Sequence, residues 1–130
     1  MAAVLTDAGM AGIAARINGT GTPAAYTYIA VGTGTTGALA ADTTLEAEIT
    51  DSGLARATDA SPTVTTTTVT NDTAVCDVTF TVTGTKAVTE CGLLNAAAAG
   101  TLLFHDVFSA YNVVNGDTLI VTAKVKVQAA

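Results

Sequence analysis

The segment Gly32–Gly37 (GTGTTG) has the G-x-G-x-x-G spacing of a dinucleotide-binding loop. In that chemistry the glycines let the backbone approach a pyrophosphate at a helix N-terminus, and an acid about 20 residues further on, here close to Asp51, holds a ribose. The motif carries this meaning only inside a β-α-β unit, whereas the chain after residue 52 has an antiparallel pattern. We therefore expect a flexible or sharply turning surface loop and no bound cofactor.

The titratable side chains do not form a recognisable catalytic pattern. His105 is the single histidine, and Asp106 beside it would point to the opposite face of a strand, so we expect His105 to be a surface or interface residue. Glu46 and Glu48 lie two apart on an expected helix and diverge, which argues against paired-carboxylate chemistry. One histidine and two cysteines are too few for the usual zinc spacings. The sequence predicts neither a catalytic nor a metal site.

The two cysteines could lie opposite each other. A two-residue turn at Thr83-Gly84 would pair Cys76 with Cys91 on neighbouring strands, within the lower range for a disulfide. The same register would place Asp77 opposite Glu90, which is an unfavourable pair of like charges. We favour two buried free thiols, with a disulfide as the alternative.

The elements that must position these residues change character near residue 52. Before it, a helix capped by Thr6 or Asp7 should run to about Ile17, and a second short helix should begin with Thr43 and Glu46 as a capping box. Strands are expected over 25–31, 54–60, 64–70, 74–83, 87–95, 101–108 and 118–127.

Short strands about 8 to 12 residues apart, with turns between them, predict a mainly β fold. Within residues 74–83, Cys76, Val78, Phe80 and Val82 form an apolar row against a polar, threonine-rich row. We expect an antiparallel β-sandwich, or a partly open barrel, with one or two short helices in the N-terminal part. Residues 1–24 would form a helical arm or docking segment, and residues 25–130 the sandwich domain.

Composition limits the function further. The chain is 49% hydrophobic, but 26 of its 130 residues are alanine, which predicts a thin core that gains from contact with a partner. Its net charge is −6 and its five cations are scattered, which argues against nucleic acid as a partner. Apolar runs are too short to predict a membrane span, and the first 20 residues do not resemble a secretion signal.

Three short stretches occur in a characteristic order. They are Tyr28–Gly34 (YIAVGTG), Asp42–Glu48 (DTTLEAE) with Arg56 after it, and Glu90–Ala96 (ECGLLNA). This ordered set resembles the N-terminal virion-attachment module of tail-collar fibre proteins of tailed bacteriophages, except that Leu94 replaces the usual aromatic residue. The positions that match the motifs are Gly32, Gly34, Leu45, Glu46, Arg56, Glu90, Gly92 and Leu93.

The resemblance implies a non-enzymatic virion structural protein, located in the virion after assembly in the host cytoplasm. Since no fibre shaft follows residue 130, we expect a capsid decoration (cement) protein that binds the head surface through the major capsid protein or other virion proteins. A tail or collar fibre adaptor is the alternative, and a cell-surface adhesive or lectin-like module is more remote. By analogy with decoration proteins we expect a homo-oligomer, for example a trimer.

Overall fold

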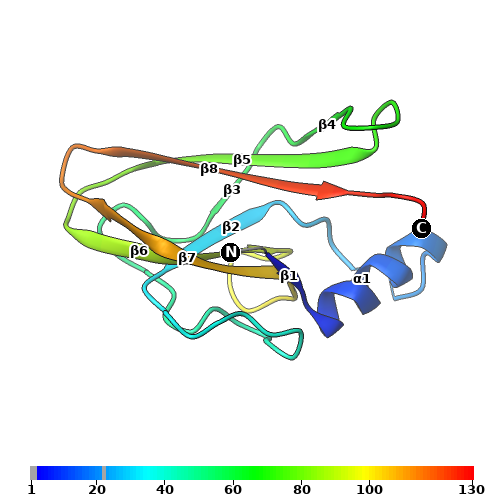
Figure 1. Cartoon of the computed structure of the whole chain (residues 1–130), viewed down its shortest axis with the longest axis horizontal. Coiled ribbons are helices and arrows are strands. Elements are labelled where there is room, and N and C mark those ends of the chain that lie inside the picture. Colours follow the sequence, from blue (N-terminus) through cyan, green and yellow to red (C-terminus); the bar gives the residue numbers. More distant parts are fainter. Residues whose placement is uncertain (1–2, 22) are drawn as a thin grey trace.

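The computed structural model describes residues 3–21 and 23–130 and has two antiparallel sheets and one short N-terminal helix (Figure 1). The prediction of a mainly β, sandwich-type fold is confirmed. Of the predicted arm over residues 1–24, residues 1, 2 and 22 lie outside the described part of the chain.

The larger sheet, sheet A, has the strand order β1-β7-β6-β2-β3, and the smaller sheet, sheet B, has the order β4-β5-β8. The strands of sheet A are β1 (Val4–Leu5), β2 (Tyr28–Gly32), β3 (Ala57–Thr58), β6 (Lys86–Leu94) and β7 (Leu102–Val113). Those of sheet B are β4 (Thr63–Thr65), β5 (Thr73–Thr81) and β8 (Thr118–Lys126).

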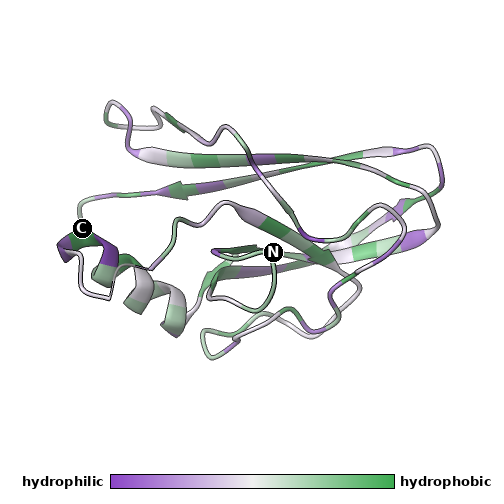
Figure 2. Ribbon diagram, turned by 180° about the vertical axis from the view of Figure 1, so that it is seen from behind, coloured by the Kyte–Doolittle hydropathy of each residue, from purple (hydrophilic) through white to green (hydrophobic). Residues whose placement is uncertain are grey.

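The main core lies between the two sheets. The predicted apolar row of β5 is confirmed, because Cys76, Val78 and Phe80 are buried while Thr79 and Thr81 are exposed. Opposite them on β8, Ala123, Val121 and Leu119 face the same interior, and apolar and polar residues alternate along the long strands in Figure 2. This alternation follows from the two-residue period of a strand that has one buried face.

Helix α1 (Asp7–Asn18) forms where the sequence predicts it. The Thr6 hydroxyl caps it by accepting the Gly9 amide at 2.8 Å, and Gly19 ends it at a φ of 75°. The helix approaches β7 closely at Gly9, where a Cβ atom would lie 2.5 Å from the Leu103 carbonyl oxygen. The side chain of Ile17, near the end of this helix, is nevertheless exposed.

The second predicted helix is wrong. Residues 33–48 form an irregular segment, the covering loop, which lies on the outer face of sheet A. A capping box at Thr43 and Glu46 does not form, since the amides of Glu46 and Ala47 donate to the Glu90 carboxylate of β6. Leu45 instead packs into a small second core with Ala30, Leu94 and Leu102.

Two predicted strands are much shorter than expected, because β3 and β4 cover only part of 54–60 and 64–70. A local carboxylate explains the second case. Asp72 accepts the amides of Thr67, Thr68 and Val69, and these hydrogen bonds hold residues 66–72 in a loop.

The predicted β5–β6 hairpin is also wrong. β5 pairs with β8, so that Cys76 is opposite Ala123, and β6 pairs with β7, so that Cys91 is opposite Asp106. The chain between β5 and β6 crosses from sheet B to sheet A, and there Val82 and Thr83 donate their amides to Asp117 and Ser52 carbonyls. The predicted pairing of Asp77 with Glu90 is therefore absent.

Candidate functional site

Glu90 is the centre of a buried polar network on the outer face of sheet A. Its side chain is fully buried. One carboxylate oxygen accepts the Gly34 amide at 2.7 Å and the Ala47 amide at 2.8 Å, and the other accepts the Glu46 amide at 2.9 Å. Because a buried carboxylate is costly unless its oxygens are paired, these bonds both satisfy Glu90 and hold the covering loop against the sheet.

His105 connects Glu90 to a second carboxylate. Its Nε2 lies 2.7 Å from a Glu90 oxygen, and its Nδ1 lies 2.7 Å from Asp42 of the covering loop. His105 is 2% exposed, so the prediction of a surface or interface residue is wrong. The partners of His105 lie 15 and 63 positions away, so the spacing to its neighbour Asp106 does not indicate them.

The charges of this network support one another. Burial by itself lowers the pKa of His105, but the hydrogen bonds and charges of Asp42 and Glu90 outweigh it and raise the pKa above its ordinary value. The pKa of Asp42 is lowered, first by the amide of Leu39 and then by His105. A protonated imidazole can donate to both carboxylates at once, which ties the loop to β6 and β7.

We expect the stability of this network to depend on pH. Asp42 has a lowered folded-state pKa, so its contribution is present above its ordinary value of 3.8 and is lost as pH falls through the folded pKa. His105 has a raised folded-state pKa, so its contribution is present below 6.5 and is lost as pH rises through the folded pKa. Urea unfolding across pH should show the highest stability between these values. Below pH 9, the ordinary pKa of a cysteine, His105→Gln should remove the decline on the alkaline side, and an unchanged decline in that range would contradict the assignment.

The arrangement of His105 does not suit general acid–base catalysis. Both ring nitrogens are held by carboxylates at 2.7 Å, and the side chain is 3% exposed. A catalytic histidine needs one nitrogen within reach of a substrate. The geometry instead suits a fixed charge that positions a loop.

The G-x-G-x-x-G segment also has a structural explanation. Gly32 and Gly34 lie against Glu90, and a Cβ at Gly32 would be 2.5 Å from a Glu90 oxygen and 2.6 Å from the Ala47 carbonyl oxygen. Gly37 has open space around it. The Glu90 carboxylate accepts the Gly34 amide of this segment, and no helix follows the segment in the described chain, so the context of a nucleotide site is absent. Gly32 and Gly34 are buried, whereas residues 33 and 35–37 are exposed, so the predicted surface loop is correct except at these two glycines.

Most of the remaining motif residues lie around the same loop. A Cβ at Gly92 would lie 2.6 Å from Leu102 and 2.8 Å from Leu45, so this position allows the second core to close. Arg56 pairs with Glu48 at 2.7 Å and donates to the carbonyl oxygens of Ala96 and Ala99 in the β6–β7 connection. Glu46 accepts the amide of Thr36, at 3.0 Å, and Leu93 packs in the main core.

The cysteines lie in different sheets. Both are buried free thiols, and the Cys76 thiol donates to the carbonyl oxygen of Tyr26 at 3.2 Å. Burial, with the charges of Asp106 and Glu90, raises the pKa of Cys91 to about 12. A thiol of that pKa is a poor nucleophile at neutral pH. Asp51, the residue closest to the ribose position of a nucleotide site, is on the surface and pairs with Lys86 at 2.9 Å.

Sequence reasoning missed an apolar cavity of about 440 Å³ beneath α1, the α1 cavity. Its walls come from α1, the segment before β2 and the facing strands of both sheets. Among the residues that the structure describes, no group of three or more histidine, cysteine or acidic side chains is placed to hold a metal, and no helix is long and apolar enough to span a bilayer. Comparison with known family models, curated proteins and solved structures finds no match to this chain.

Proposed function

We propose that the chain is a non-enzymatic structural protein of tailed-bacteriophage virions, and specifically a capsid decoration protein that binds the head surface. The proposal begins from the ordered set of motifs that resembles the tail-collar fibre module. Its strongest support is where the motif residues lie in the fold.

The motif positions are spread over more than sixty residues, yet most of them contact one unit. Gly32, Gly34 and Glu46 lie at the Glu90 carboxylate through backbone or close packing. Leu45 and Gly92 close the small core beneath the same loop, and Arg56 holds Glu48 at its end. Short matches that arose by chance would have no reason to meet. Their convergence is expected if the motif residues are the ones that hold the covering loop on sheet A, in this chain and in the proteins that the motif resembles.

The surface chemistry supports a binding role. Two large apolar side chains, Ile17 and Val127, are exposed at the edge of the α1 cavity. Exposed apolar groups that gather around a cavity are typical of protein interaction sites. The one histidine, which an enzyme could have used, is engaged by two carboxylates.

Mass spectrometry of purified virions tests this proposal. Virions of the phage that encodes the chain should contain it in a copy number comparable with that of the major capsid protein. Such a high copy number follows from occupying symmetry-related sites over the head surface. Intact virions without the chain would contradict the proposal.

The alternative of a tail or collar adaptor is favoured by the resemblance itself, which is to a tail-collar module. That role would give a low copy number, set by the symmetry of the tail. Separation of heads from tails before mass spectrometry distinguishes the two, because the chain should follow the heads in one case and the tails in the other.

A further inference from the structure

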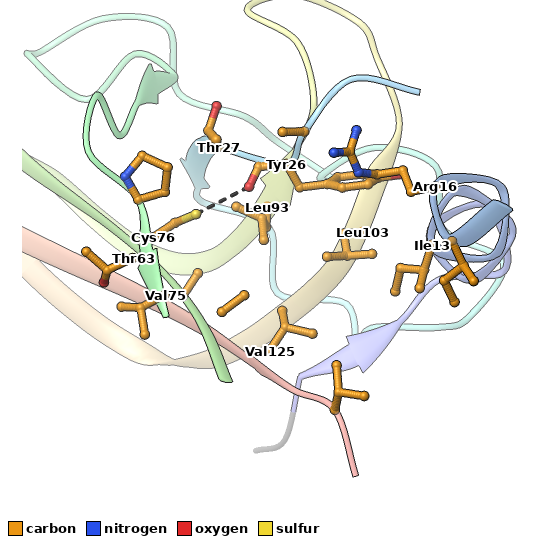
Figure 3. Close-up of a pocket in the computed structure, with 16 residues that line it drawn as sticks. Ile13, Arg16, Tyr26, Thr27, Thr63, Val75, Cys76, Leu93, Leu103 and Val125 are labelled. Carbon is orange, nitrogen blue, oxygen red and sulfur yellow. Dashed lines mark hydrogen bonds between the residues drawn. The ribbon is translucent and has the colours of Figure 1, made fainter. Parts of the chain in front are cut away.

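The α1 cavity is open and almost wholly apolar where it faces the interior. Its walls include Ile13 of α1, Leu93 and Leu103 of sheet A, and Val75 and Val125 of sheet B (Figure 3). A cavity of about 440 Å³ is within the range of specific binding sites and can accept one or two large side chains. The sandwich is therefore incompletely filled at the end where α1 lies.

The rim of the cavity is apolar and exposed. Ile17 on α1 is 82% exposed and Val127, just after β8, is 78% exposed, and both line the cavity. A small ligand inside the cavity would leave these side chains in water. Covering them requires a protein surface, which favours a protein partner over a small molecule.

Two polar groups lie at the cavity, and one of them, Arg16, indicates which charge the partner should carry. The hydroxyl oxygen of Tyr26 is buried and has no hydrogen-bond partner among the described residues, and its ring extends toward α1 beside Arg16 (Figure 3). Arg16 is exposed, donates to the Pro23 carbonyl oxygen, and takes part in none of the ion pairs of the described chain. A carboxylate is the natural partner for an unpaired guanidinium at the edge of an apolar site.

We propose that the α1 cavity is the site that binds the chain to its virion partner, and that it accepts a large apolar side chain from a partner segment that also carries a carboxylate for Arg16. The inference rests on the proposed function and adds the binding site and the chemistry of the partner. The predicted docking role of residues 1–24 is consistent with it, since α1 supplies one wall.

The test uses virions purified from a phage that lacks the gene for this chain. Purified protein is added, and the bound fraction is measured by co-sedimentation over a range of concentrations. Ile17→Glu and Arg16→Glu should each raise the half-saturating concentration by roughly tenfold or more, because each removes one part of the expected contact. Ile17 is exposed, so Ile17→Glu should unfold at the wild-type urea concentration. Arg16→Glu removes the hydrogen bond to Pro23 and places a negative charge in the last turn of α1, so its urea midpoint should fall slightly while the protein stays folded.

The matched controls are Ile120→Glu and Lys124→Glu, which make the same changes at exposed positions of β8 outside the α1 cavity. They should bind within about twofold of the wild type if the cavity is the site. Equal binding by all four variants and the wild type would overturn the cavity proposal and leave the virion function standing. Absence of binding by the wild type itself would overturn both.

Native mass spectrometry of the purified chain tests other occupants. The proposal expects a free cavity in the absence of virions. A dimer that disappears in Ile17→Glu would identify a second copy as the occupant, and a retained small amphiphile would identify a ligand site. Either result would overturn the proposed partner.

Discussion

Replacing Glu90 by glutamine should lower the free energy of unfolding by about 3–5 kcal/mol, the range observed when one partner of a buried charge network is removed. The glutamine side chain keeps one acceptor oxygen, but three backbone amides and His105 converge on the present carboxylate. Its amide group would also face N–H donors where the carboxylate oxygen now accepts them. Urea denaturation of the two proteins at pH 6 measures the difference.

The control is Glu46→Gln, in the same loop. Glu46 is exposed and its carboxylate accepts an amide from Thr36, so we expect a loss of less than about 1 kcal/mol. A domain of this size has a total stability of roughly 5–15 kcal/mol, so Glu90→Gln should also reduce the yield of soluble protein. If the two substitutions cost the same, Glu90 does not hold the covering loop.

Gly32→Ala should lower the free energy of unfolding by about 3 kcal/mol, at the upper end of the usual cost of overpacking. The new Cβ would meet a Glu90 oxygen at 2.5 Å and the Ala47 carbonyl oxygen at 2.6 Å. The carbonyl belongs to the backbone of the covering loop, so the loop as a whole would have to move and the amide bonds to Glu90 would weaken. Thermal and urea unfolding of the purified variant measure the loss.

Gly37→Ala is the matched control from the same G-x-G-x-x-G segment. A Cβ there meets nothing within 4 Å, and the backbone is outside the left-handed region, so the change should be neutral or stabilise by a few tenths of a kcal/mol. In a dinucleotide loop the third glycine is needed for close packing of helix and strand. Comparable destabilisation at both positions would contradict the structural explanation of this segment.

The position of His105 makes the attachment of the covering loop dependent on pH. His105 connects the covering loop to β6 and β7. The pKa of its partner Asp42 is below the ordinary value of 3.8, and the pKa of His105 itself is above the ordinary value of 6.5. The loop should therefore be held most firmly in mildly acidic solution. The α1 cavity lies on the other side of sheet A, between the two sheets, but α1 itself contacts the covering loop through the Asp7 amide, which donates to the Ala40 carbonyl oxygen.

Several elements could be predicted from the sequence because their signals are local. Thr6 and Gly19 mark the two ends of α1, since a hydroxyl cap and a left-handed glycine act within one helical turn. The alternation in β5 and β8 predicts which residues face the core, because successive side chains of a strand point to opposite faces. The motif pattern includes Glu90, although it does not predict the hydrogen-bond partners of this residue.

Only the tertiary structure decided which strands pair and which donors meet the buried carboxylate. Alternation in β5 is equally compatible with β6 or β8 as a neighbour, and the choice of β8 separated Cys76 from Cys91. Thr43 and Glu46 have the spacing of a helix start, yet the amides of Glu46 and Ala47 donate to Glu90, which lies more than 40 residues away. His105 likewise found its partners through the sheet and the loop. These outcomes depend on desolvation, because a buried carboxylate needs hydrogen-bond donors and the folded chain supplies them from distant positions. No local spacing in the sequence indicates which donors these will be.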